Sequence, residues 1–238
     1  MNIHLTPSSV TKFMVSLIAV LTVMHLTQMG LYYYIDDRDV FTWIKLIDFG
    51  YEANLPSIYS VMAIAFSGLL LALITTHHKR LKQPYYAWLG LTLIFLFLAL
   101  DEGASIHEKI GDFTEDNIID ASGYFYYEWV IPYAIFVTLF VVGYLSYLFS
   151  LPKKIAIQFV IAGTIFLSGA VGLEMLSAQE ADTFNTNTVT YSVLYTTEEL
   201  LEMIGIVVFV NALLKYIQSE IGSIQFTLST SSNEENNK

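Results

Sequence analysis

The chain has 238 residues, of which 55% are hydrophobic and only 14% are charged, and its mean hydropathy is +0.55. This composition excludes an ordinary soluble domain and predicts a single membrane domain. The net charge of −11 argues against nucleic acid as a partner, and the absence of cysteine excludes disulfides, iron–sulfur clusters and thiolate zinc sites.

Six stretches are long and apolar enough to cross a hydrocarbon core of about 30 Å as helices, which takes about 20 residues each. The sequence therefore predicts an all-α polytopic membrane protein, a bundle of six transmembrane helices in one domain over residues 1–218. Asn54 is a candidate N-cap of the second helix, and Pro56 suits its first turn. The expected helices cover residues 12–34, 57–77, 86–110, 129–151, 154–178 and 190–217.

Two segments outside these helices have their own patterns. Residues 35–55 carry Phe41, Trp43 and other apolar side chains, and they could form a short helix lying on the membrane surface. Residues 219–238 end in Ser, Thr, Asn and Glu, which predicts a disordered cytoplasmic tail.

The basic residues indicate the orientation. With both termini cytoplasmic, eight of the 11 Lys and Arg residues lie on the cytoplasmic side, as the positive-inside rule requires. Only Glu220, Glu234 and Glu235 of the 22 acidic residues share that side. We therefore expect an integral protein of a bacterial-type inner (plasma) membrane, with its acidic residues facing outside.

Acidic residues within the apolar segments mark a candidate site. Asp101 and Glu102 follow an apolar run, and His107 and Glu108 come soon after them. Ionised groups in hydrocarbon cost several kcal/mol each, roughly, so their presence points to function. Counting about 1.5 Å per helical residue places polar groups from four helices at one depth below the outer boundary. Those on the other three helices are His25, Glu174, Glu198, Glu199 and Glu202.

Helical phase predicts that these groups converge. On a continuous third helix Asp101 and Glu108, seven residues apart, point nearly the same way. Glu198, Glu199 and Glu202 fall within a sector of about 100° on the last helix. The two helices can therefore direct their carboxylates at one point.

Several carboxylates cannot all stay ionised at close range unless a metal, another cation or shared protons compensate them. Oxygen-rich ligation with His suits zinc, iron or manganese, so the sequence predicts a divalent metal site. Glu102 and Glu199 are the candidate catalytic residues. The candidate metal ligands are His25, Asp101, His107, Glu108, Glu174, Glu198 and Glu202.

These residues favour a metal-dependent, hydrolase-like enzyme embedded in the membrane and acting on a lipid-like substrate. A cation or proton transporter or channel could use the same carboxylates, and so could a non-catalytic membrane subunit whose polar cluster fixes helix packing. Expected partners are membrane lipid and a lipid-like or cationic ligand, and the oligomeric state is left open. The external loops at residues 50–56 and 124–129 are candidates to cover the site, the second offering an aromatic wall.

Some of these residues also fit a purely structural role. Thr196 and Glu199 fit a helix-capping box, in which Glu198 would only favour the helix dipole. His25 is also a candidate core histidine with ordinary hydrogen bonds, and Glu174 a candidate surface carboxylate.

One family resemblance is confined to two residues. The pair Glu198 and Glu199, in a segment that ends at Glu202, is similar to the paired glutamates of CAAX-protease-like membrane enzymes. Met203 stands where that motif has Arg, and no His follows His107, so the resemblance assigns no family.

Overall fold

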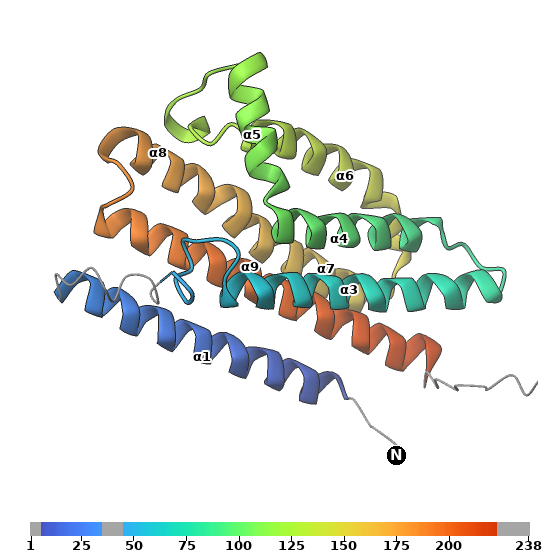
Figure 1. Ribbon diagram of the computed structural model, residues 1–238. Coiled ribbons are helices and arrows are strands. Elements are labelled where there is room, and N and C mark those ends of the chain that lie inside the picture. The colour runs from blue at the N-terminus through green and yellow to red at the C-terminus, as the bar shows by residue number, and fades with distance from the viewer. Residues whose placement is uncertain (1–5, 35–44, 223–238) are drawn as a thin grey trace, which may run out of the picture.

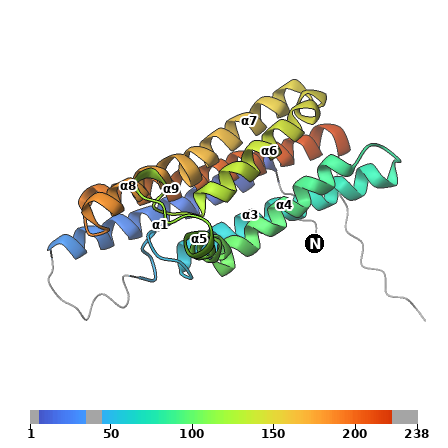
Figure 2. The ribbon, with the colours of Figure 1, turned by 90° about the horizontal axis from the view of Figure 1, so that it is seen from above.

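The computed structural model describes residues 6–34 and 45–222, and within those ranges every regular element is helical. Figures 1 and 2 show the long helices running roughly alongside one another. The elements are α1 (Pro7–Tyr34), α3 (Leu55–Arg80), α4 (Tyr86–Ala104), α5 (Ile106–Asn117), the 3₁₀ turn η2 (Gly123–Phe125), α6 (Val130–Ser150), α7 (Lys153–Leu167), the π-helical turn η3 (Ser168–Leu173), α8 (Glu174–Phe184), α9 (Val189–Tyr216) and the π-helical turn η4 (Ile217–Ile221).

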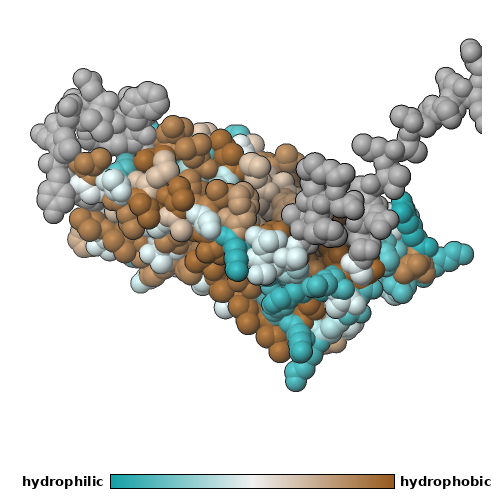
Figure 3. Space-filling view, turned by 90° about the horizontal axis from the view of Figure 1, so that it is seen from below, coloured by the Kyte–Doolittle hydropathy of each residue, from teal (hydrophilic) through white to brown (hydrophobic). Residues whose placement is uncertain are grey.

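Six helical segments of the described chain are long and apolar enough to span a membrane, as the sequence predicts. They are Pro7–Tyr32, Leu55–Arg80, Tyr86–Ala104, Val130–Ser150, Lys153–Phe184 and Val189–Ile221. Large apolar side chains such as Phe13, Met62 and Phe149 are exposed along these helices. Figure 3 shows an apolar surface over much of one face, which suits a hydrocarbon environment.

Helix α9 forms the centre of the bundle and packs against α1, α3 and α7. Its buried side chains include Met203, Val207 and Leu213. Two glycines let the neighbouring chain approach α9 closely: a Cβ at Gly205 would lie 2.8 Å from the Phe166 backbone nitrogen, and one at Gly169 would lie 2.7 Å from the Glu198 carbonyl oxygen. The close packing of α9 against α7 and η3 therefore requires glycine, which has no side chain, at both positions.

The second span begins as predicted, with Asn54 as N-cap and Pro56 in the first turn. The Asn54 side-chain oxygen accepts a hydrogen bond from the Ser57 backbone N–H at 3.1 Å, while its amide donates to three carbonyl oxygens of residues 45–51. The interfacial helix predicted at 35–55 is only partly testable, since residues 35–44 lie outside the described chain. Residues 45–54 form turns and bends rather than a helix.

The third predicted helix is not continuous. Helix α4 ends at Ala104, Ser105 adopts a left-handed conformation with φ of +47°, and α5 begins at Ile106. The two helices diverge in Figure 1. The expected eclipsing of Asp101 and Glu108 on one helix is therefore wrong, because the phase of a helix does not carry across a left-handed residue.

The fifth predicted helix extends beyond residue 178 to Phe184 and contains the π-helical turn η3. Such turns widen a helix locally and are frequent at functional sites. Here the turn immediately precedes Glu174. The last helix begins at Val189 with Thr188 as its N-cap, so the capping-box reading of Thr196 and Glu199 is wrong. The predicted disordered tail begins too early at residue 219, because residues up to Ile221 belong to η4, and the tail beyond Gly222 lies outside the described residues.

Candidate functional site: an acidic cavity

A cavity of about 540 Å³ lies where α3 begins and α4, α5, α8 and the first half of α9 come together. Among the described residues that line it are ten carboxylate side chains and one imidazole, His107, but no Lys or Arg. Both loops expected to cover the site contribute to its lining. The ten acidic residues are Glu52, Asp101, Glu102, Glu108, Asp112, Glu128, Glu174, Glu198, Glu199 and Glu202.

Asp101 is buried and fully hydrogen-bonded. Its Oδ1 accepts a hydrogen bond from the His107 backbone N–H at 2.7 Å, and its Oδ2 accepts one from the Tyr133 hydroxyl at 2.8 Å. The first bond satisfies a free amide in the opening turn of α5, as a capping side chain does. Asp101 therefore holds α4, α5 and α6 together at the cavity wall.

His107 lies between two carboxylates. Its Nδ1 is 3.3 Å from Asp101 Oδ1, and its Nε2 is 3.2 Å from Glu52 Oε1. Burial alone would lower the pKa of His107, but hydrogen bonds and charge from Asp101 and Glu52 outweigh it and raise the pKa to about 10. At neutral pH His107 is therefore an imidazolium, and both ring nitrogens are occupied.

Glu108 follows His107 on α5 and also lines the cavity. Burial, followed by the negative charge of Glu52, raises the pKa of Glu108 above its ordinary value. Despite the helix break, Glu108 therefore still belongs to the acidic group.

Glu174 and Glu198 form a pair across α8 and α9. Their side chains interact with each other at the cavity, which both of them line. Trp129 donates its indole N–H to Glu174 Oε1 at 3.0 Å, and the Ser177 hydroxyl lies 3.4 Å from Glu198 Oε2. These contacts fix both side chains at the cavity.

Glu102, Glu199 and Glu202 line the same cavity but have fewer hydrogen bonds to hold them. Within the described chain their carboxylates have no hydrogen-bond donor, and they interact only through charge, with one another and with His107. Glu102 comes from the end of α4, whereas Glu199 and Glu202 come from α9. These three unpartnered carboxylates are the groups most available to a ligand.

The structure does not bring His25 into this group. Its Nε2 lies 2.9 Å from the Thr196 hydroxyl, and its Nδ1 accepts a hydrogen bond from the Phe49 backbone N–H at 3.2 Å. The ring also stacks on Phe49 at 4.4 Å between centroids. His25 is thus a buried core histidine that anchors the loop carrying Glu52.

Sequence reasoning missed Glu52, Trp129 and Tyr133 as parts of the site. Each contacts a predicted site residue, yet each lies in a loop or at a helix start where neither helical phase nor depth gave a signal. The aromatic cluster around Trp129 suggested a cover for the site but not its hydrogen bond to Glu174.

A second acidic group combines the end of α5 with the segment between α5 and α6, and its Glu128 also lines the acidic cavity. Within the described part of the chain, Glu115, Asp120 and Glu128 are the only three side chains whose candidate ligand atoms all lie within 4.8 Å of one another. Glu115 and Asp120 are exposed. Exposed acidic groups often occur without an ion, so this group serves below as a control rather than as the proposed site.

Fold and cavity together define an all-helical protein with six potential membrane spans and an acidic cavity at one end. The chain belongs to the family described as a domain of unknown function (DUF8692), whose model matches residues 13–216. Searches of curated proteins and of solved structures each gave no match.

Proposed function

We propose that the protein crosses a bacterial-type plasma membrane six times, with both termini in the cytoplasm and the acidic cavity near the outer surface. The split of basic residues supports this orientation. It is also supported by the exposed apolar side chains along the potential spans. In this arrangement the cavity takes its ligands from outside the cell or from the outer leaflet.

We further propose that the cavity is the active site of a membrane-embedded, divalent-cation-dependent enzyme of the hydrolase type. One observation carries this proposal: Glu102, Glu199 and Glu202 meet in one cavity whose described lining offers a single basic side chain, His107, against ten carboxylates. Buried carboxylates in this number require protons or bound cations. A divalent cation both compensates the charge and polarises a bond for attack by water.

The hydrogen bonds suggest separate roles for the residues. Glu174, Glu198 and Glu202 are proposed as metal ligands, and Glu199 as the general base that takes a proton from the attacking water. Glu102 is proposed as the acid that returns a proton to the leaving group. Asp101, His107 and Glu108 would form the wall that positions the ligands and the two catalytic glutamates. The polar atoms of Asp101 and His107 already contact each other, Tyr133 and Glu52.

This assignment also bears on the metal. With His107 held as an imidazolium and His25 outside the cavity, the proposed ligands are all carboxylate oxygens. Such a set suits hard cations and favours manganese over zinc and iron, the other metals that the sequence suggests.

A cation transporter is the second candidate, since the same carboxylates could bind a transported ion. A second cavity lies beside the acidic one, between α6 and helices α4, α7 and α9, and its described lining residues include no carboxylate, Lys, Arg or His. At the far end of the bundle, His78 Nε2 lies 2.9 Å from the Tyr216 hydroxyl, and the rings of both pack around Trp88. Because ionisable side chains line only one of the two cavities, the described residues provide no continuous polar path for an ion. This favours an enzyme over a transporter.

The test uses the full chain in liposomes made from native membrane lipid extract, with Mn²⁺ outside and a Mn²⁺-sensitive dye inside. Mass spectrometry of the lipids measures turnover, and the dye measures transport. The enzyme predicts a new lipid product that is lost in Glu199→Gln and kept in Glu115→Gln, without dye response. Dye response without product, or neither signal, would overturn the proposal.

A further inference from the structure

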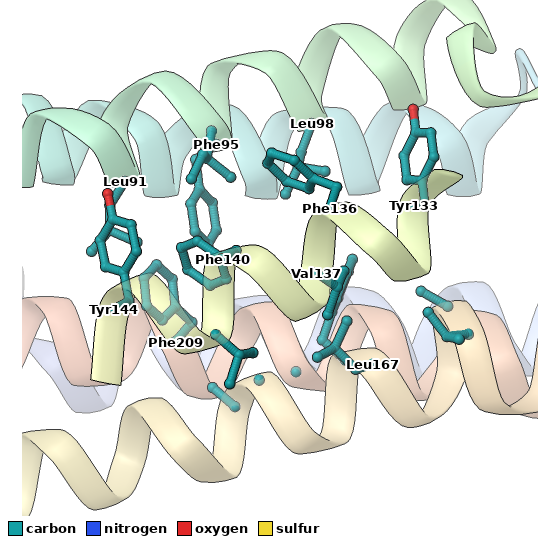
Figure 4. A pocket seen from close by; sticks show the side chains of 18 of the residues that line it. Leu91, Phe95, Leu98, Tyr133, Phe136, Val137, Phe140, Tyr144, Leu167 and Phe209 are labelled. Atoms are coloured by element: carbon teal, nitrogen blue, oxygen red, sulfur yellow. The ribbon is translucent and has the colours of Figure 1, made fainter. Parts of the chain in front are cut away.

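A larger apolar cavity of about 900 Å³ lies beneath α6, between that helix and α4, α7 and α9. Figure 4 shows Phe95, Phe140 and Leu167 directed into it from three of these helices. Helix α6 buries only Val130 among its 21 residues, so it stands away from the bundle along most of its length. The Tyr133 hydroxyl bonds to Asp101 at one end, and the Tyr144 hydroxyl donates to the Ala87 carbonyl oxygen at 3.2 Å toward the other.

The apolar cavity adjoins the acidic cavity. Five residues line both, which makes them the boundary between the two: Leu98, Trp129, Tyr133, Phe166 and Ala170. The inner neighbour of the acidic cavity is thus hydrocarbon-like space rather than packed protein.

The boundary itself is amphipathic. Tyr133 and Trp129 line both cavities, and their polar atoms bond to Asp101 and Glu174 of the acidic cavity. Aromatic side chains with one polar tip suit a place where apolar and polar surroundings meet. The boundary therefore matches the division between the chain and the head group of a lipid.

The dimensions fit a single hydrocarbon chain. The lining of α6 from Pro132 to Leu148 covers roughly 24 Å at 1.5 Å per residue, whereas one leaflet of hydrocarbon is about 15 Å deep. An extended hydrocarbon chain that enters at the end nearest the acidic cavity can therefore lie along α6 within this length.

Charge selects the head group. Ten carboxylates against one imidazole make the formal charge of the acidic cavity strongly negative. An anionic head group would be repelled there, whereas an ammonium group would be attracted. The unpartnered Glu102 and Glu202 are available to accept its hydrogen bonds.

We propose that the substrate is a long-chain amine lipid, with its hydrocarbon chain in the apolar cavity beneath α6 and its ammonium head group in the acidic cavity. This inference rests on the proposed function, since it names the substrate class of that site. It does not require metal or turnover for binding, which keeps its test separate.

The test is photolabelling of the full chain in phosphatidylcholine nanodiscs containing EDTA, with hexadecylamine carrying a mid-chain diazirine. The matching alcohol and carboxylic acid are the comparison probes. We expect the amine to label α6 or α7 at least fivefold more than the acid. The double variant Glu102→Gln/Glu202→Gln should bring amine labelling down to the level of the alcohol. Equal labelling by amine and acid would overturn the proposal.

Two glycines provide matched variants for the apolar half. Gly163 lines the cavity and Gly143 does not, and a Cβ at either would meet nothing within 4 Å. Gly163→Phe should reduce amine labelling at least fivefold, while Gly143→Phe leaves it unchanged. Val137→Trp fills the same cavity from α6 and should act like Gly163→Phe. Full labelling in both cavity-filling variants would overturn the proposal. If the wild type is labelled as expected but shows no Mn²⁺-dependent turnover, that result counts against the proposed function alone.

Discussion

Asp101 Oδ1 accepts a hydrogen bond from the His107 backbone N–H at 2.7 Å and lies 3.3 Å from Nδ1 of the same residue. One carboxylate oxygen thus starts α5 and orients the imidazolium of the acidic cavity. The bond spans the left-handed Ser105, where the chain leaves the direction of α4. It links the change of helix direction directly to the candidate site.

Replacing Asp101 tests this link. Asp101→Ala removes the acceptor of both the His107 amide and the Tyr133 hydroxyl, so we expect a loss of about 1 to 3 kcal/mol in unfolding free energy. Asp116→Ala, at an exposed position of α5, is the matched control and should change stability little. Thermal unfolding in detergent measures both, and equal stabilities would show that Asp101 does not hold the junction.

Replacing Glu202 should have the opposite effect on stability to replacing Asp101. Its carboxylate has no hydrogen-bond donor in the described chain and faces other glutamates. Without metal, Glu202→Gln removes repulsion, so the Tm should stay constant or rise by about 2 to 4 °C, the shift that roughly 1 kcal/mol gives at this chain length. A clear fall in the Tm of the metal-free variant would mean that Glu202 belongs to a structural network.

The sequence predicted the six potential spans and most of the acidic side chains that line the cavity. Apolar run length fixes a spanning helix well, and Asn54 with Pro56 marked the start of α3. The break at Ser105 was not predictable, because Asp101 makes it favourable through a bond to the amide of His107, six residues along the chain. Glu52 escaped notice because its approach to His107 depends on a loop held by His25, Asp48 and Asn54.

The charge of His107 gives a pH-dependent stability. Its pKa is about 10 in the folded protein against 6.5 in the unfolded chain, so its stabilising effect is complete below pH 6.5 and is lost as pH rises through about 10. The Tm difference between wild type and His107→Gln should therefore be largest near pH 6 and shrink toward pH 10. The acidic groups that interact with His107 are Glu52, Asp101, Glu102, Glu108, Glu174, Glu199 and Glu202.

Detergent unfolding scans from pH 6 to pH 10.5 measure this difference. Subtracting the variant from the wild type removes the titration of groups that both share. A difference that stays constant across the range would show that His107 is not held as an imidazolium.

The α7–α9 contact predicts contrasting effects at two glycines. A Cβ at Gly205 would lie 2.8 Å from the Phe166 backbone nitrogen, so Gly205→Ala should cost about 1 to 3 kcal/mol through overpacking. Gly163→Ala meets nothing within 4 Å and should be neutral or stabilising by up to about 1 kcal/mol. Unfolding in denaturant compares them, and similar values for both would contradict the close helix approach.

The most direct test of the central claim is a Mn²⁺ titration of the metal-free full chain, followed by electron paramagnetic resonance. If the acidic cavity binds the cation, wild type and the loop variant Glu115→Gln/Asp120→Asn will bind Mn²⁺ with the same stoichiometry, and Glu202→Gln will lose that binding. Loss in the loop variant with normal binding in Glu202→Gln, or no Mn²⁺ binding by the wild type, would contradict a metal site in the acidic cavity.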